Sequence, residues 1–163
     1  MELTLKGISK EAIQGAIELA QLYRYLNEPS ETESICRDIL AVDKHHQLAI
    51  RLLGLSLTEQ FTGRATDRHR DAERVFRRLT DPYEQLYYLG LLHERQAKAL
   101  LEAGKSTVMV AALLREALKR FEEAEKIRPV GNDESILRWN RCVRLIQSRP
   151  ELEWSPTDDK NHR

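Results

Sequence analysis

Several kinds of residue are scarce in this chain, and each scarcity excludes a class of protein. Only two cysteines, Cys36 and Cys142, occur among the 163 residues, and nothing demands a disulfide framework. They lie far apart without a CxxC or Cys/His spacing, which predicts two small buried side chains in a reducing compartment. No apolar run approaches the ~18 residues of a membrane span, and the first ten residues lack the apolar core of a signal peptide. We therefore expect a cytoplasmic protein that makes no membrane contact.

An excess of charge of either sign is also absent. Lysine and arginine number 26, and aspartate and glutamate number 26. The field around the molecule therefore has no overall sign, which gives no support to binding of nucleic acid or acidic membranes through bulk charge. Any electrostatic recognition has to be local. The length fits one domain with its own hydrophobic core.

No pattern of residues points to catalysis. Gly104-Lys105-Ser106 is similar to the end of a phosphate-binding loop, but Ala99, within a predicted helix, replaces the glycine that such a loop needs five residues earlier. The histidines form no HExxH or H-x3-H set, and no Ser/His/Asp or Cys/His signature is present. The sequence predicts no enzyme, no cofactor and no metal site. Gly104 is expected to end one helix and Ser106 to begin the next.

Helical periodicity is what the sequence has in abundance. Start and stop signals place seven helices, and few residues alternate as in strands, so an all-α fold is predicted. Asp81, Pro82 and Glu84 form the clearest start signal, because they combine an N-cap, proline at the first helical position and a capping-box glutamate. Ser9 is expected to cap the first helix, and a capping box at residues 30–33 to open the second. The seven expected helices cover approximately residues 10–26, 31–42, 46–61, 67–79, 82–103, 107–127 and 133–148.

The segment Glu116–Pro129 carries a distinctive spacing, A-x3-F-x2-A-x4-P. Ala117, Phe121 and Ala124 fall on one helical face, where two small residues let a neighbouring helix approach and the ring fills the gap between them. Pro129 then stops the helix. This spacing resembles the second helix of a tetratricopeptide repeat.

Upstream segments resemble the first helix of such a repeat. Leu-Gly pairs end at Gly54 and at Gly90, and the glycine permits close packing of the partner helix. A Leu-Ala pair that ends at Ala20 places alanine in the same small position. The resemblance is thus carried by three candidate first helices.

Each candidate first helix is followed by a candidate second helix. Ala72 and Phe76 repeat the alanine–phenylalanine spacing, whereas Thr32 and Cys36 occupy those positions in the first unit. The resemblance implies three helix-turn-helix repeats in a short right-handed α-solenoid with a C-terminal capping helix. The implied repeats are approximately 12–44, 47–80 and 83–129 and the capping helix is 133–148, all within a single domain 1–149 followed by a flexible polar tail 150–163.

The third repeat is longer than the family's. Residues 83–129 count 47 against a period of about 34, which indicates roughly two extra turns in each helix. Its tip, Val108–Leu114, is apolar on all sides and needs burial. One hypothesis is that the tip packs inside the domain. The other is homodimerisation or partner contact through Ala97, Leu101, Val108, Met109 and Ala112.

The resemblance also implies a function, because first helices in the family line a concave groove that binds an extended or helical peptide. A non-enzymatic adaptor or scaffold for a protein partner is therefore expected. Leucine and tyrosine would supply buried area, and arginine would pair with carboxylates. The implied groove residues are Ile17, Gln21 and Arg24 from repeat one, Leu48, Arg51, Leu55 and Thr58 from repeat two, and Tyr87, Leu91, Glu94 and Arg95 from repeat three.

One alternative to this groove stays open. Some of these residues could instead pack against the N-terminal or C-terminal helix. The Lys/Asn carboxylate clamp of the chaperone-binding members is not expected, because its positions here hold Ile17, Gln21, Leu52, Glu84 and Tyr88.

Two arginine clusters support a different class of function, contact with nucleic acid or phosphate. Acids interleave the cluster in the fourth helix and permit i,i+4 pairs, so a solvated face is favoured there. No acid occurs from Ser135 through Ser148 in the seventh helix, and Trp139 adjoins its arginines. The clusters are Arg64, Arg68, Arg70, Arg74, Arg77 and Arg78 in the fourth helix, and Arg138, Arg141 and Arg144 in the seventh.

Overall fold

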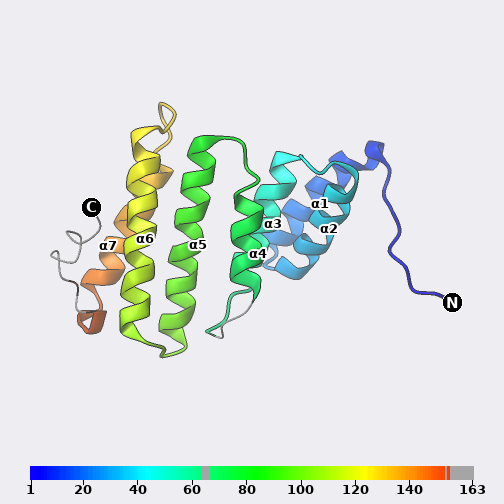
Figure 1. Ribbon diagram of the computed structural model, residues 1–163. Helices are drawn as coiled ribbons and strands as arrows, with labels where there is room; N and C mark the ends of the chain where they lie inside the picture. Colours follow the sequence, from blue (N-terminus) through cyan, green and yellow to red (C-terminus); the bar gives the residue numbers. More distant parts are fainter. Residues whose placement is uncertain (64–66, 153, 155–163) are drawn as a thin grey trace. The chain divides into compact units, whose positions relative to one another are not determined.

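The computed structural model describes residues 1–63, 67–152 and 154, and this part of the chain contains seven α-helices and no strand. The predicted all-α class is confirmed. Two short 3-10 helices, η1 (Lys10–Ala12) and η2 (Pro150–Leu152), flank the seven. The α-helices are α1 (Ile13–Tyr25), α2 (Pro29–Val42), α3 (Gln47–Glu59), α4 (Asp67–Phe76), α5 (Pro82–Glu102), α6 (Thr107–Lys126) and α7 (Glu134–Gln147) (Figure 1).

Local capping signals set several of these helix ends. The Asp81 carboxylate accepts a hydrogen bond from the Glu84 N–H at 3.1 Å, and the Ser106 hydroxyl accepts one from the Met109 N–H at 3.4 Å. Gly104 has φ +66°, a left-handed conformation that costs glycine little. Its N–H donates to the Leu101 carbonyl and the next N–H to the Leu100 carbonyl, which closes α5 in a Schellman motif. The predicted roles of these three residues are confirmed.

The start of α2 differs from the prediction. The helix begins at Pro29, where proline's fixed φ suits the first helical position, and Glu28 provides no side-chain cap. The capping box predicted at residues 30–33 does not form, because the helix begins before Ser30 and the Glu33 side chain has other partners. Thr32 donates to the Ala20 carbonyl, and the Glu33 carboxylate accepts from Gln60 and Arg68.

Other predicted boundaries shift by a few residues. Ser9 gives no side-chain cap, and the chain enters α1 through η1. At the start of α3, His46 is the N-cap, because its Nδ1 accepts a hydrogen bond from the Ala49 N–H at 3.1 Å. The helices α3 and α4 end at Glu59 and Phe76, earlier than predicted.

The chain divides into two compact units, and the boundary falls within α5 between Gln85 and Leu86. The first unit holds α1 to α4 and the first turn of α5. Consecutive helices pack on each other, and α1 also contacts α3. The second unit holds the rest of α5, α6, α7 and η2, together with Thr62 and Gly63.

A glycine–phenylalanine contact joins α3 to α4 in the first unit. A Cβ on Gly54 would lie 2.2 Å from Cε1 of Phe76, so only glycine fits beside this buried ring. In the preceding hairpin, formed by α1 and α2, a hydrogen bond replaces the glycine–phenylalanine contact. There the Thr32 hydroxyl donates to the Ala20 carbonyl at 2.9 Å, and both residues are fully buried.

The same glycine–phenylalanine contact recurs in the second unit. A Cβ on Gly90 of α5 would lie 2.7 Å from Cε1 of Phe121 in α6. The helices themselves are longer: α5 has 21 residues and α6 has 20, against 13 in α3 and 10 in α4. The predicted lengthening of this hairpin is confirmed.

Part of the predicted tail is ordered. Residues 150–152 form η2, which packs on α6 and α7 and buries Leu152. The guanidinium of Arg115 lies 4.6 Å from the centre of the Trp154 ring. The remainder of the tail predicted to be flexible lies outside the described residues.

Candidate functional site

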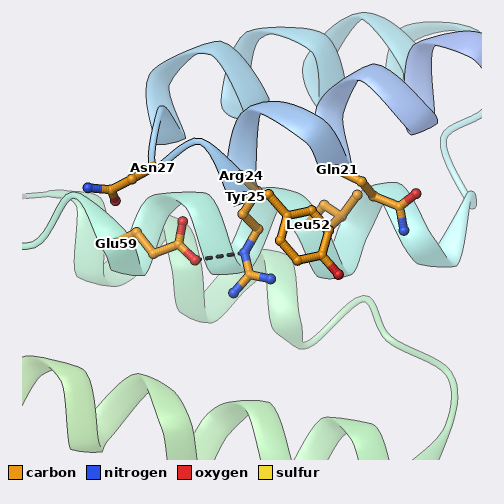
Figure 2. Close-up of a pocket in the computed structure, with 6 residues that line it drawn as sticks. All are labelled: Gln21, Arg24, Tyr25, Asn27, Leu52 and Glu59. Carbon is orange, nitrogen blue, oxygen red and sulfur yellow. Dashed lines mark hydrogen bonds and ion pairs between the residues drawn. The ribbon is translucent and has the colours of Figure 1, made fainter.

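A hollow of about 420 Å³ lies in the first unit, between the C-terminal half of α1 and α3. Figure 2 shows its walls: two amides, an ion pair, an exposed phenol ring and one apolar side chain. Its volume falls within the range of ligand pockets, roughly 300–1,000 Å³. The lining residues are Gln21, Arg24, Tyr25, Asn27, Leu52 and Glu59.

The end of α1 shapes one rim of the hollow. Asn27 has φ 58°, and asparagine is one of the few residues that adopt this left-handed conformation readily. The Glu28 N–H donates to the Tyr23 carbonyl at 2.9 Å and the Asn27 N–H to the Arg24 carbonyl at 3.1 Å. These two bonds satisfy the last carbonyls of α1. They hold Arg24 and Tyr25 in the final turn of the helix, beside α3 (Figure 2).

An ion pair crosses the hollow from α1 to α3. Nε of Arg24 donates to Oε1 of Glu59 at 2.7 Å, and both side chains keep partial contact with solvent. The two terminal nitrogens of Arg24 point away from Glu59 in Figure 2, and they make no hydrogen bond within the described part of the chain. Because guanidinium recognises carboxylate with two parallel bonds, this end of Arg24 can bind an acidic group.

The apolar part of the hollow comes from Leu52 and Tyr25. Leu52 is buried in α3 and forms the floor, whereas Tyr25 is 91% exposed at the rim. An exposed tyrosine ring offers a ligand a large apolar contact area and a polar hydroxyl at its end. The hollow therefore combines a free guanidinium edge with an adjacent apolar surface.

The predicted groove residues of the first two repeats meet this hollow only in part. Gln21 and Arg24 line it, but Ile17 is in the core. In α3 the predicted residues lie on an adjoining face. Leu48 is half-buried and Arg51 pairs with Glu84, while Leu55 and Thr58 are buried.

Sequence reasoning missed four residues of the hollow. Leu52 and Glu59 are seven positions apart, so they share one face of α3. This face is about 100° from that of Arg51 and Thr58, because the predicted register was displaced by one residue. Tyr25 and Asn27 come after Arg24, which is the last groove residue predicted in the first repeat. The turn-forming character of Asn27 before Pro29 was the available signal for the rim.

In the second unit, α7 covers the face predicted to be a groove. Tyr87, Leu91 and Glu94 are buried, and Arg95 is half-buried. The Glu94 carboxylate contacts Lys98, and its Oε1 lies 3.6 Å from Nη1 of Arg138 in α7. The alternative in which the C-terminal helix packs on this face therefore applies to Glu94.

Arg138 is held in this buried network. Burial alone would lower the pKa of Arg138, but its hydrogen bond with Tyr87 and the charge of Glu94 raise the pKa overall. The guanidinium thus stays charged and compensates the buried carboxylate. This arrangement uses Tyr87 and Glu94 for packing of α7, and it leaves neither side chain exposed for a ligand.

The residues predicted for self-association are only partly at the surface. Ala97 is buried and Leu101 is half-buried, whereas Val108, Met109 and Ala112 at the start of α6 are exposed. The helix tip therefore has one exposed apolar side, while Val110, Ala111 and Leu114 supply its buried side.

Most arginines of the predicted cluster in α4 have internal partners. Arg68 pairs with Glu33 at 3.0 Å, Arg74 with Asp71 at 3.7 Å and Arg77 with Glu73 at 2.8 Å. Arg78 donates to the Lys44 carbonyl at 2.6 Å, and Arg64 lies outside the described residues. These contacts favour a structural role over phosphate binding. In α7, Arg141 and Arg144 are exposed, whereas Arg138 is half-buried.

Other chemical groups take structural positions. Cys36 and Cys142 are free and buried, and burial raises the pKa of each thiol to about 12. Among the described residues, no group of three or more His, Cys, Asp or Glu side chains is placed to hold a metal ion. Within the same residues no helix is long and apolar enough to cross a bilayer.

No known protein family, no curated protein and no solved structure matches this chain. The resemblance to tetratricopeptide repeats therefore rests on the residues and contacts described above.

Proposed function

We propose that this protein is a non-enzymatic interaction module, built from hairpins similar to tetratricopeptide repeats, that binds a peptide segment in the α1–α3 hollow. The observation that carries the proposal is the orientation of Arg24. Its Nε is fixed by Glu59, and its terminal nitrogens are left for a ligand. The expected ligand offers a carboxylate to Arg24 and an apolar side chain to Tyr25 and Leu52.

The repeated helix contacts support the proposed kinship. Gly54 with Phe76 and Gly90 with Phe121 make the same close approach at the positions that the repeat pattern implies. The first hairpin substitutes a buried hydrogen bond, from Thr32 to the Ala20 carbonyl, at the matching position. Hairpins of this type present their first helices on one side, which is where α1 and α3 form the hollow.

The polarity of the hollow favours an acidic ligand over a basic one. Arg24 is the more exposed partner of the pair, with 33% of its side chain accessible against 19% for Glu59. Charge-assisted bonds to guanidinium are stronger than neutral ones. Glu59 fixes the guanidinium before binding, which lowers the entropy lost when a ligand binds.

The experiment is selection of random peptides displayed on phage against the intact chain. Peptides that carry an aspartate or glutamate next to an aliphatic or aromatic residue should be enriched. Their affinity, measured by fluorescence anisotropy, should fall at least about tenfold in Arg24→Gln, because a charge-assisted contact is lost.

Arg144→Gln is the matched control. It removes one exposed arginine and causes the same change in net charge, so it should leave the affinity unchanged. Equal binding to wild type and Arg24→Gln would show that the peptide sits elsewhere. Selection of peptides without an acidic residue would contradict the proposed chemistry.

A further inference from the structure

The first helix is apolar on two opposite sides. Its inner side buries Ile17 and Ala20 in the core of the first unit. Its outer side carries Leu19, Leu22 and Leu26, which are 44%, 51% and 58% exposed. A surface helix ordinarily shows a single apolar stripe that faces its own core. The second stripe has no partner within the described chain.

The outer stripe has the spacing of a helix-pairing seam. Ala12, Gly15, Leu19, Leu22 and Leu26 follow one another at alternating steps of three and four residues, as positions a and d do in a heptad. Small residues occupy its N-terminal end and leucines its C-terminal end. A Cβ built on Gly15 meets no atom within 4 Å, so the fold of the single chain does not require glycine there.

This asymmetry makes the seam complementary to itself in the antiparallel direction. With Leu19 opposite Leu19 of a second copy, Gly15 faces Leu22 and Ala12 faces Leu26. Leu22 and Leu26 then each meet a small residue, as interlocking helix surfaces require, and the two Leu19 side chains meet at the centre. A twofold axis through Leu19 relates the two helices, so each contact away from the axis occurs twice.

We propose that the outer face of α1 is a homodimer interface in which two copies pair their first helices antiparallel. The occupant of the face is a second copy of this chain, because the large and small residues of the seam match under the twofold axis. The interface is separate from the proposed ligand hollow, which lies on the α3 side of α1.

The chain before α1 supplies further contact area. A helix of this length spans only about 20 Å, whereas stable interfaces bury about 800 Å² on each partner. Residues 1–9 run as an extended segment away from α1 (Figure 1) and leave Leu3 and Leu5 almost fully exposed. In the antiparallel pair, this segment follows the C-terminal end of the partner helix. Its two leucines can therefore add contact area beside the exposed Leu26 there.

Sedimentation velocity of the intact chain over a concentration series tests the proposal. Wild type should show a monomer–dimer equilibrium. Gly15→Leu should raise the dissociation constant at least roughly tenfold, because the added side chain meets Leu22 of the second copy. The melting midpoint of the variant, measured on dilute monomer, should not fall, since the site is open and leucine favours helix over glycine.

Val108→Ser is the matched control on the other exposed apolar surface, at the start of α6, and it should leave the equilibrium unchanged. Leu19→Cys should give a disulfide-linked dimer under mild oxidation, because the residue lies on the axis. Val108→Cys should not, and the native cysteines are buried and do not compete. A wild type that stays monomeric, a Gly15→Leu variant that dimerises normally, or dissociation by Val108→Ser would each overturn the proposal.

Discussion

Replacing Gly54 by alanine should destabilise the first unit, although alanine is the better helix former. The added Cβ would lie 2.2, 2.5 and 2.7 Å from Cε1, Cδ1 and Cζ of Phe76. Contacts under 3 Å to three ring atoms require a displacement of the ring or of the helices. Phe76 is fully buried, so the ring cannot swing into solvent.

The magnitude follows from two opposing effects. Alanine in place of glycine favours a helix by about 1 kcal/mol, whereas overpacking a filled core typically destabilises by about 1–3 kcal/mol. Because the added Cβ would meet three atoms of a rigid ring, we expect a cost near the upper end of this overpacking range. The net loss is then about 2 kcal/mol, which lowers the melting midpoint of a chain of this size by about 4–8 °C.

Urea unfolding of wild type, Gly54→Ala, Phe76→Leu and the double variant measures the contact. Leucine removes the ring, so the double variant should be more stable than the sum of the single changes predicts. The coupling should be at least about 1 kcal/mol. Gly15→Ala is the control, because its Cβ meets nothing within 4 Å and it should be neutral or stabilising. A Gly54→Ala variant as stable as wild type would refute the close packing.

Two further predictions concern buried polar contacts in the first unit. Thr32→Val keeps the shape but removes the hydrogen bond to the Ala20 carbonyl, so the free energy of unfolding in urea should fall by about 1 kcal/mol; no change would assign the contact a packing role only. Burial alone would raise the pKa of Glu33, but hydrogen bonds from Gln60, Arg37 and Arg68 lower it overall. The unfolded state therefore binds more protons, and Glu33 stabilises above its ordinary pKa of 4.5 and loses this effect as the pH falls through the lowered value. Glu33→Gln should accordingly flatten the acid side of the stability–pH curve, and an unchanged slope would contradict the network.

Local chemistry in the sequence determined several of the helix ends. Asp81, Ser106 and Gly104 each act on backbone groups within a few residues, so their roles can be read without knowing the fold. The Leu-Gly pairs likewise predicted close packing of a partner helix at Gly54 and Gly90, and the structure places Phe76 and Phe121 there.

Contacts between residues distant in sequence decided which helical face lines the hollow. Arg51 is drawn to Glu84 and Arg24 to Glu59, and each pair spans more than 30 positions. A change of one residue in register rotates a helix face by about 100°, which separates the hollow at Leu52 from the predicted face at Arg51. No local signal sets that rotation.

In the second unit, too, local sequence does not show which helical face stays exposed. Tyr87 and Glu94 were predicted to line a groove. In the structure both are buried, and Arg138 of α7 lies against them. The sequence by itself determined the helices and several of their ends, because these depend on neighbours in the chain. Only the tertiary structure decided which guanidinium nitrogens keep no partner within the described chain, because a carboxylate distant in sequence, such as Glu59 beside Nε of Arg24, reaches them only after folding.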